Sequence, residues 1–192
     1  MDETSQKIID ATMSLVRDKG YVATTTKDIA RLAGVNESTL FRKFNSKKDI
    51  VLHGIEQEKW RANLTTEIFQ NVSWDLRTDL EMFMSEYMNR ITVDFVNLSI
   101  GLRAPQIYDE TAPLIMKVPQ AFVTALIDYF QKMEQKGKLP PLDFECLAMT
   151  VFSSTFGFTF VSASFGEKLT KLDKSTFIKE TVDTFIKGIP QL

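Results

Sequence analysis

Polar and basic side chains gather at short spacing between Thr24 and Ile50, in the segment TTTKDIARLAGVNESTLFRKFNSKKDI. Amides, hydroxyls and guanidinium groups at such positions can hydrogen-bond the edges of bases and the oxygens of phosphates. The side chains that we expect to be available for these contacts are Asn36, Glu37, Ser38, Thr39, Arg42 and Lys43. The chemistry that this segment offers is therefore the binding of a nucleic acid.

Two short helices joined by a tight turn must hold these side chains in place. Thr25 is followed three residues later by Asp28, the spacing of a helix-capping pair, and Gly34 permits the backbone conformation that ends a helix. Asn36 is a favourable cap for the next helix. The apolar residues expected between the two helices are Ile29, Ala30, Val35 and Leu40. This pattern predicts a helix-turn-helix, whose second helix enters the major groove of DNA. A helical hairpin with a solvated face has the same pattern and stays open as an alternative at this point.

The segment from Ile8 to about Leu52 resembles the TetR-type transcriptional regulators. The residues that carry the resemblance, in the family's order and spacing, are Thr24, Thr25, Ile29, Ala30, Ala33, Gly34, Val35, Asn36, Thr39, Leu40, Phe41, Phe44, Ser46 and Lys47. The resemblance implies an all-α homodimer with a three-helix DNA-binding domain and a larger ligand-binding domain. It favours the helix-turn-helix over the plain helical hairpin.

The resemblance also implies roles for single residues. Thr25 matches a capping threonine that reaches a phosphate, and Lys47 matches a lysine that contacts a phosphate from the fourth helix. Phe41 departs from the pattern, because the family usually has a tyrosine there whose hydroxyl bonds a phosphate; Arg42 or Lys43 would have to supply that contact. The DNA-binding residues that we expect are Thr25, Thr26, Asn36, Glu37, Ser38, Thr39, Phe41, Arg42, Lys43 and Lys47.

Helical spacing of apolar residues continues along the rest of the chain, and no stretch alternates with a period of two, so we predict an all-α fold of about nine helices. The ranges expected to be helical outside the helix-turn-helix are 4–19, 50–70, 75–91, 113–136, 143–165 and 175–187, with a short broken helix and loop over 101–111. We expect a DNA-binding domain over 1–48 and a ligand-binding and dimerisation domain over 49–192.

The second domain is rich in side chains that suit an apolar binding pocket, since the chain has 15 Phe and 8 Met. Aromatic side chains at helical spacing also form ordinary cores, and this alternative stays open. The candidate ligand-binding residues are Trp60, Phe83, Tyr87, Ile91, Arg103, Tyr108, Phe122, Phe152 and Phe156. They predict a small apolar or aromatic effector, with Tyr87, Tyr108 or Arg103 as its polar contacts.

A stretch from Cys146 to Phe165 has no charged residue and is long enough to span a membrane. Ser and Thr are frequent in it and Gly157 lies inside, so we expect a packed helix instead of a membrane span. The resemblance implies that the last two helices form a dimer interface. The candidate interface residues are Ser153, Gly157, Val161, Ser164, Phe177, Val182 and Phe185, with Ile189 beside them.

Enzymatic and metal sites mostly need matched His, Cys or carboxylate residues, and the chain has a single His53 and a single Cys146, far apart in sequence. We therefore expect no catalysis, no metal and no cofactor. With one cysteine and no apolar leader-like stretch at the front, the chain is expected in the cytoplasm.

These observations predict a ligand-responsive repressor that binds an inverted-repeat operator in double-stranded DNA as a homodimer and is released by a small apolar or aromatic effector. A ligand pressing on the far half of the fourth helix, near Trp60 and Leu64, is expected to tilt that helix and change the spacing of the paired recognition helices. The alternative is a helical small-molecule carrier or scaffold whose front module binds a protein instead of DNA.

Overall fold

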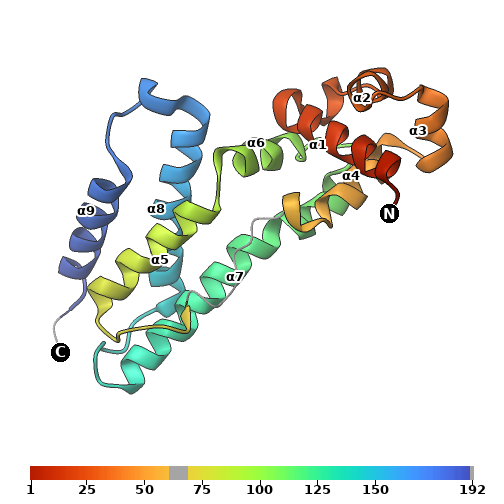
Figure 1. Cartoon of the computed structure of the whole chain (residues 1–192). Helices are drawn as coiled ribbons and strands as arrows, with labels where there is room; N and C mark the ends of the chain where they lie inside the picture. Colours follow the sequence, from red (N-terminus) through yellow and green to blue (C-terminus); the bar gives the residue numbers. More distant parts are fainter. Residues whose placement is uncertain (61–68, 191–192) are drawn as a thin grey trace. The chain divides into compact units, whose positions relative to one another are not determined.

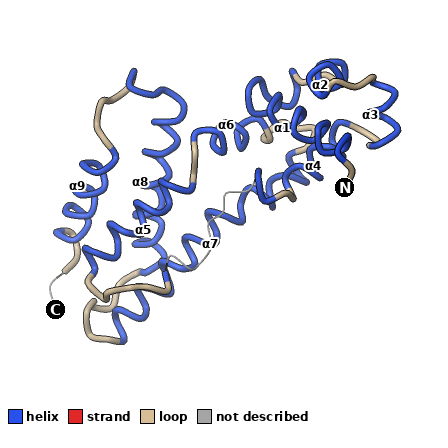
Figure 2. Tube along the Cα trace, viewed as in Figure 1, coloured by secondary structure: helices blue, strands red, loops and turns tan. Residues whose placement is uncertain are grey.

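The computed structural model describes residues 1–60 and 69–190, and these residues form α-helices, short 3-10 helices and loops, with no β-strand among them (Figures 1 and 2). The α-helices are α1 (Glu3–Ala23), α2 (Thr26–Ala33), α3 (Glu37–Lys43), α4 (Lys47–Ile55), α5 (Leu76–Arg90), α6 (Val93–Gly101), α7 (Tyr108–Gln135), α8 (Phe144–Phe165) and α9 (Lys174–Lys187). The 3-10 helices are η1 (Glu58–Trp60) and η3 (Gly166–Lys168). The predicted all-α class is confirmed.

Side-chain caps mark the beginning of most helices. In each case a carboxylate or hydroxyl oxygen accepts the backbone N–H three residues further on, which satisfies one of the free donors of the first turn. The residues that cap in this way are Asp2, Thr25, Ser46, Asp75, Asp143 and Asp173. Local sequence therefore sets where the helices begin.

The chain divides into two compact units, and each is described by itself. The first comprises Met1–Ala62 and Asp94–Met116, and the second comprises Asn63–Val93 and Lys117–Leu192. This division differs from the boundary expected after Lys48, because α4 packs on α1 and the segment 94–116 adds side chains to the same core. The division into DNA-binding and ligand-binding domains stays a prediction.

The core of the first unit forms around one side of α1. Ile8, Ile9, Met13 and Val16 of this helix are fully buried. The buried residues that surround them are Ile29, Leu40, Phe44, Ile50, Val51, Ile55, Leu98, Leu102 and Ile107. Helices α2 to α4 and α6 thus share one apolar core with α1, and that core supports the surface formed by α2 and α3.

Two glycines allow other segments of the first unit to approach α1 closely. A Cβ atom on Gly54 of α4 would lie 2.5 Å from the sulfur of Met13, and a Cβ atom on Gly101 of α6 would lie 2.3 Å from the carbonyl oxygen of Val16. Neither distance leaves room for an alanine in the present packing. Gly54 is unfavourable for a helix by propensity, and the close contact with Met13 explains why it lies there.

Several expected boundaries are corrected by the structure. The helix expected over 50–70 ends at Ile55 and is followed by η1; residues 61–68 of it, including Leu64, lie outside the described residues. Helix α6 was not predicted, and α7 begins at Tyr108, ahead of the expected start near Pro113. The early start is fixed by tertiary contacts, since Thr111 Oγ1 donates to the carbonyl oxygen of Leu102 at 2.8 Å. Helices α8 and α9 have almost the predicted bounds.

The second unit packs α5 against α8 and α9, with apolar side chains of α7 completing its core. One carboxylate lies inside it: Asp79 of α5 is 1% exposed. It accepts hydrogen bonds from the hydroxyl of Tyr129 at 2.8 Å, and from the backbone N–H and the hydroxyl of Ser73 at 2.7 and 2.8 Å. Three donors thus satisfy a buried polar group that would be costly without them.

Replacing Gly101 by alanine tests the close approach of α6 to α1. We expect G101A to lower the free energy of unfolding by about 1–3 kcal/mol, because the new methyl group meets backbone that has to move. Urea unfolding followed by circular dichroism measures the change. The control is Gly188→Ala, where φ is −80° and the nearest atom lies at 3.4 Å. A G101A variant as stable as the unmodified chain would contradict the contact.

Candidate nucleic-acid interface and ligand pocket

Helices α2 and α3 present the polar side chains that the sequence analysis selected. Gly34 ends α2 in the left-handed conformation with φ 69°, and α3 starts three residues later. Leu40 is buried, whereas the polar residues around it stay accessible. The predicted DNA-binding residues that are exposed are Thr25, Asn36, Glu37, Ser38, Phe41, Arg42 and Lys43, while Thr26, Thr39 and Lys47 are half-buried. The predicted residues of α2 and α3 therefore lie on two adjacent helices of the first unit.

A network around Asp28 fixes the start of α2. The backbone N–H of Asp28 donates to Thr25 Oγ1 at 3.1 Å, and that hydroxyl donates back to the Asp28 carboxylate at 2.8 Å. Lys19 and Arg31 also bond this carboxylate, at 2.6 and 2.8 Å. The hydrogen bonds from Lys19 and Thr25 lower the pKa of Asp28 to about 2. The predicted capping by Thr25 is thus present, and it is tied to two cations of α1 and α2.

Two of the predicted DNA-binding side chains are hydrogen-bonded to each other. Thr26 at the start of α2 donates from its hydroxyl to the Glu37 carboxylate at the start of α3, at 2.7 Å. Lys43 at the end of α3 bonds the Asp2 carboxylate at 2.5 Å. Arg42 forms no ion pair within the described part of the chain. Among the described residues, Arg42 is therefore the cation of α3 that could meet a phosphate or a base without first breaking an ion pair.

Lys47 is held by backbone of the preceding helices. Its ammonium group donates to the carbonyl oxygens of Tyr21 and Thr24 at 2.7 and 2.6 Å and lies 4.0 Å from the centre of the Tyr21 ring. Burial lowers the pKa of this lysine. Lys47 thus supports the turn that carries Thr25, and one of its three N–H groups is left for a phosphate.

Asn36 differs in one detail from the expectation, and Phe41 lies on the surface of α3. Asn36 takes the position before α3, and its carbonyl oxygen accepts from Thr39 and Leu40, but its side chain makes no capping bond. The amide is therefore available for other contacts. Phe41 is 53% exposed on α3, an unusual environment for a large apolar ring.

Five of the aromatic candidates for ligand binding lie together in the second unit. The Tyr87 ring lies 4.8 Å from that of Phe122 and 6.0 Å from that of Phe152, and Phe152 lies 5.6 Å from Phe156. Phe83 and Phe122 are fully buried. Phe152 and Phe156 are half-buried, and a role of these five residues in ligand binding stays a prediction. Burial raises the pKa of Tyr87.

The other four candidates do not join this cluster. Trp60, Arg103 and Tyr108 belong to the first unit, where Trp60 packs against the core and Arg103 lines a groove beside the end of α1. Ile91 is buried in the second unit. The nine residues therefore do not line one pocket within either unit.

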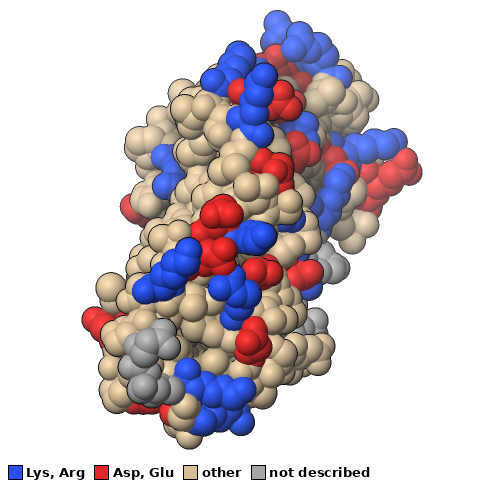
Figure 3. Space-filling view, turned by 90° about the vertical axis from the view of Figure 1, so that its left-hand side faces the viewer, with Lys and Arg blue, Asp and Glu red and all other residues tan. Residues whose placement is uncertain are grey.

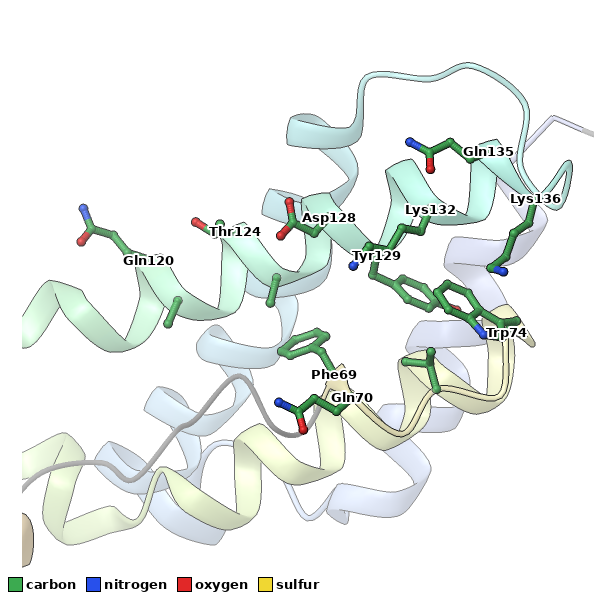
Figure 4. A pocket seen from close by; sticks show the side chains of 13 residues that line it. Phe69, Gln70, Trp74, Gln120, Thr124, Asp128, Tyr129, Lys132, Gln135 and Lys136 are labelled. Atoms are coloured by element: carbon green, nitrogen blue, oxygen red, sulfur yellow. The ribbon is translucent and has the colours of Figure 1, made fainter.

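A pocket of about 970 Å³ lies in the second unit between α7 and residues 69–74 (Figure 4). Its aromatic lining is Phe69, Trp74 and Tyr129, and its polar lining includes Gln120, Thr124, Asp128, Lys132, Gln135 and Lys136. None of these residues is among the candidates expected from the sequence. The available signal was the spacing of four between Asp128, Lys132 and Lys136, which places them on one face of a helix. Trp74 gave no such signal, because it follows a predicted break.

Helix α8 leaves much of its apolar surface uncovered in the single chain. It is long and apolar enough to cross a membrane by length and composition, and only 22% of its most apolar stretch is buried. A Cβ atom added to Gly157 would meet nothing within 4 Å. Ser153 and Ser164 are exposed and Val161 is half-buried. Figure 3, which turns the left-hand side of Figure 1 to the viewer, shows broad areas without charged side chains between groups of mixed charge.

The candidate interface residues of α9 contact their own chain. Phe177 stacks on Phe158 with ring centres 4.0 Å apart, and Phe185 lies 6.1 Å from Phe130. Val182 is 1% exposed and belongs to the core. A role for these three at a dimer interface stays a prediction, with α8 providing most of the uncovered surface.

No group of three or more His, Cys, Asp or Glu residues that could hold a metal ion is found in the described part of the chain. His53 lies on α4, where it contacts the carbonyl oxygen of Asp49 at 2.8 Å and the ring of Phe44. The carboxylate of Asp49 also lies 3.3 Å from His53 Nδ1. Cys146 is exposed in the first turn of α8.

Comparison with known proteins gives consistent matches in sequence and in structure. Residues 8–53 match the model of the family described as bacterial regulatory proteins, tetR family. The chain is 28% identical over 193 residues to the HTH-type transcriptional regulator YvkB of Bacillus subtilis (strain 168), with 98% of each chain covered. It is 26% identical over 175 residues to the biofilm operon icaADBC HTH-type negative transcriptional regulator IcaR of Staphylococcus aureus (strain Newman), with 88% of this chain and 89% of that protein covered.

A similar solved structure is that of the transcriptional regulator FadR from Bacillus subtilis in complex with stearoyl-CoA. It matches with a TM-score of 0.68 and 18% identity, over 96% of this chain and 99% of that one. At this identity the likeness concerns the fold. The relatives matched in sequence are regulators of transcription.

The hydrogen bonds around Asp28 predict how the stability of the folded chain changes in acid. Because the pKa of Asp28 in the folded chain is lowered to about 2, below the value of about 3.9 in an unfolded chain, its contribution to stability is present above pH 4 and is lost as the pH falls towards 2. We expect D28N to be less stable than the unmodified chain at pH 6 and the difference to shrink by pH 2.5. Urea midpoints at both pH values measure it. A difference that does not change with pH would contradict the assignment.

Proposed function

We propose that this chain, which belongs to the TetR family of transcriptional regulators, is a repressor that binds an inverted-repeat operator as a homodimer and is released by a small effector. The observation that carries the proposal is the exposed polar face of α3 beside the capped start of α2. A helix presented in this way can enter the major groove while the start of the preceding helix meets the phosphates.

Repression is supported by the relatives. IcaR is described as a negative regulator, and it matches this chain over most of its length. A bound repressor blocks transcription as long as its operator affinity is high, so an effector needs only to lower that affinity. A 100-fold loss needs about 2.7 kcal/mol of differential effector binding between the two states.

Dimerisation is supported by the uncovered surface of α8. An apolar helix face that its own chain leaves open is typically buried against another protein surface. Gly157, with no atom within 4 Å of its added Cβ, allows a partner helix to approach closely. A second copy of α8 across a two-fold axis fits this surface and would present two α3 helices to two half-sites.

We place the coupling between effector and operator on α7 in addition to the fourth helix. We expected one long fourth helix that extends past Trp60 and tilts when the effector binds. The fourth helix, α4, instead ends at Ile55. Helix α7 contributes residues up to Met116 to the first unit and residues from Lys117 to the second. In the first unit, Glu110 bonds Lys48 of α4 at 2.7 Å. A displacement of α7 caused by an effector would thus reach α4.

The competing proposal is a helical carrier or scaffold whose front module binds a protein. It shares the fold and differs in the partner of α3. Salt distinguishes the two, because phosphate contacts release counterions and weaken steeply with ionic strength, whereas an apolar protein interface hardly responds. We further propose that the chain is not an enzyme and that it acts in the cytoplasm, where its operator would be.

Selection of bound sequences from a random DNA pool at two salt concentrations tests the function. We expect an inverted repeat to be enriched and its affinity to fall steeply with salt. Arg42→Ala should weaken operator binding by about tenfold to 100-fold. The matched control is Lys179→Ala, which removes a cation from the exposed side of α9 and should leave binding unchanged. Failure to enrich any sequence would favour the carrier or scaffold.

A charge placed on α8 tests the dimer. Gly157→Glu should raise the dimer dissociation constant at least about 30-fold, because it buries an unpaired carboxylate at the proposed interface. Sedimentation at several concentrations measures the change. Gln106→Glu, which adds the same charge at an exposed turn ahead of α7, is the control. A G157E chain that stays dimeric would refute the interface.

A further inference from the structure

The pocket between α7 and residues 69–74 has an aromatic wall at one end. The rings of Trp74 and Tyr129 lie almost parallel, with an interplanar angle of 10° and centres 6.0 Å apart. Figure 4 shows the two rings side by side, with Phe69 further along the same side of the pocket. A wall of this shape favours a flat, apolar molecule that can stack on it.

Two lysines stand at the same end of the pocket, and neither has an acidic partner in the part of the chain that the structure describes. Lys132 and Lys136 are four residues apart on α7, so they project from the same face of the helix. Neither forms an ion pair within the described residues, and the ammonium group of Lys136 lies 4.4 Å from the centre of the Trp74 ring. Asp128, the acidic residue of the described lining, is one further turn back along α7. The positive charge is therefore concentrated beside the aromatic wall.

The wall is fixed in place before any ligand arrives. Trp74 has φ 60°, a strained conformation for a bulky residue, and its carbonyl oxygen accepts from the ammonium group of Lys138 at 2.6 Å. Asp79 joins the two sides of the wall, since it accepts hydrogen bonds from Ser73 next to Trp74 and from the hydroxyl of Tyr129. Burial and this bond raise the pKa of Tyr129. Strain that is held by surrounding bonds is typical of binding sites, and a preformed wall lowers the entropy cost of binding.

We propose that this pocket binds a flat aromatic carboxylate, whose ring stacks on Trp74 and Tyr129 and whose carboxylate is held by Lys132 and Lys136. A volume of about 970 Å³ accommodates a molecule of drug size. If the chain is the proposed repressor, such a molecule would also be its effector, and this part alone rests on the proposed function. The binding itself depends on the pocket alone.

The experiment compares two probes of the same shape, 2-naphthoate and its neutral amide 2-naphthamide, by isothermal titration of the full chain. We expect the carboxylate to bind at least about tenfold more tightly, since hydrogen bonds to charged groups are stronger than neutral ones. In the double variant Lys132→Gln and Lys136→Gln the preference should disappear while the amide binds as before. Lys187→Gln, at the end of α9, is the control and should keep the preference.

Three results would overturn the proposal: no binding of either probe, equal affinity for both in the unmodified chain, or a preference that survives in the double variant. Operator binding is measured separately and without probe. If the chain binds no DNA but prefers the carboxylate, the proposed function fails and the pocket assignment stands. If it binds DNA but shows no preference, the outcome is the reverse.

Discussion

The close contact of α6 with α1 joins the middle of the chain to the core of the amino-terminal helices. Because Gly101 has no side chain, α6 lies against the backbone of Val16, and the segment that follows adds Leu102 and Ile107 to the core around α1. The amino-terminal helices thus do not form their core alone. The core that supports α2 and α3 includes residues from the middle of the chain, and the start of α7 lies in the same unit as α3.

Local signals in the sequence were sufficient to predict the two short helices α2 and α3 and the turn between them. Thr25, Gly34 and Ser46 act through bonds and backbone conformations that span only a few residues, and these are the same in any fold that contains them. Helices α8 and α9 were predicted from the helical spacing of their apolar residues, and α9 also from the glycine that follows its end. Neither prediction depended on knowing which elements pack together.

The pocket could not be predicted in the same way, because it depends on residues distant in sequence. Tyr129 and Asp79 are 50 positions apart, and their hydrogen bond brings Ser73 and Trp74 to α7. Nothing in the spacing of these residues indicates the pairing. The spacing of Phe and Tyr residues predicted Phe83, Tyr87 and Phe122 as ligand contacts, but these three side chains are buried in the core. Periodic aromatic residues indicate burial, and a binding pocket needs a place where the packing is interrupted.

The uncovered face of α8 also bears on how the stability of the protein depends on its concentration in the cell. In the proposed dimer this face is covered only when two chains meet, so the folded state gains stability from association and becomes more stable as the protomer concentration rises. A chain made in small amounts would then be less well protected from unfolding and degradation as well as less able to occupy its operator. Abundance would control both properties through a single surface, the one on which Gly157 lies.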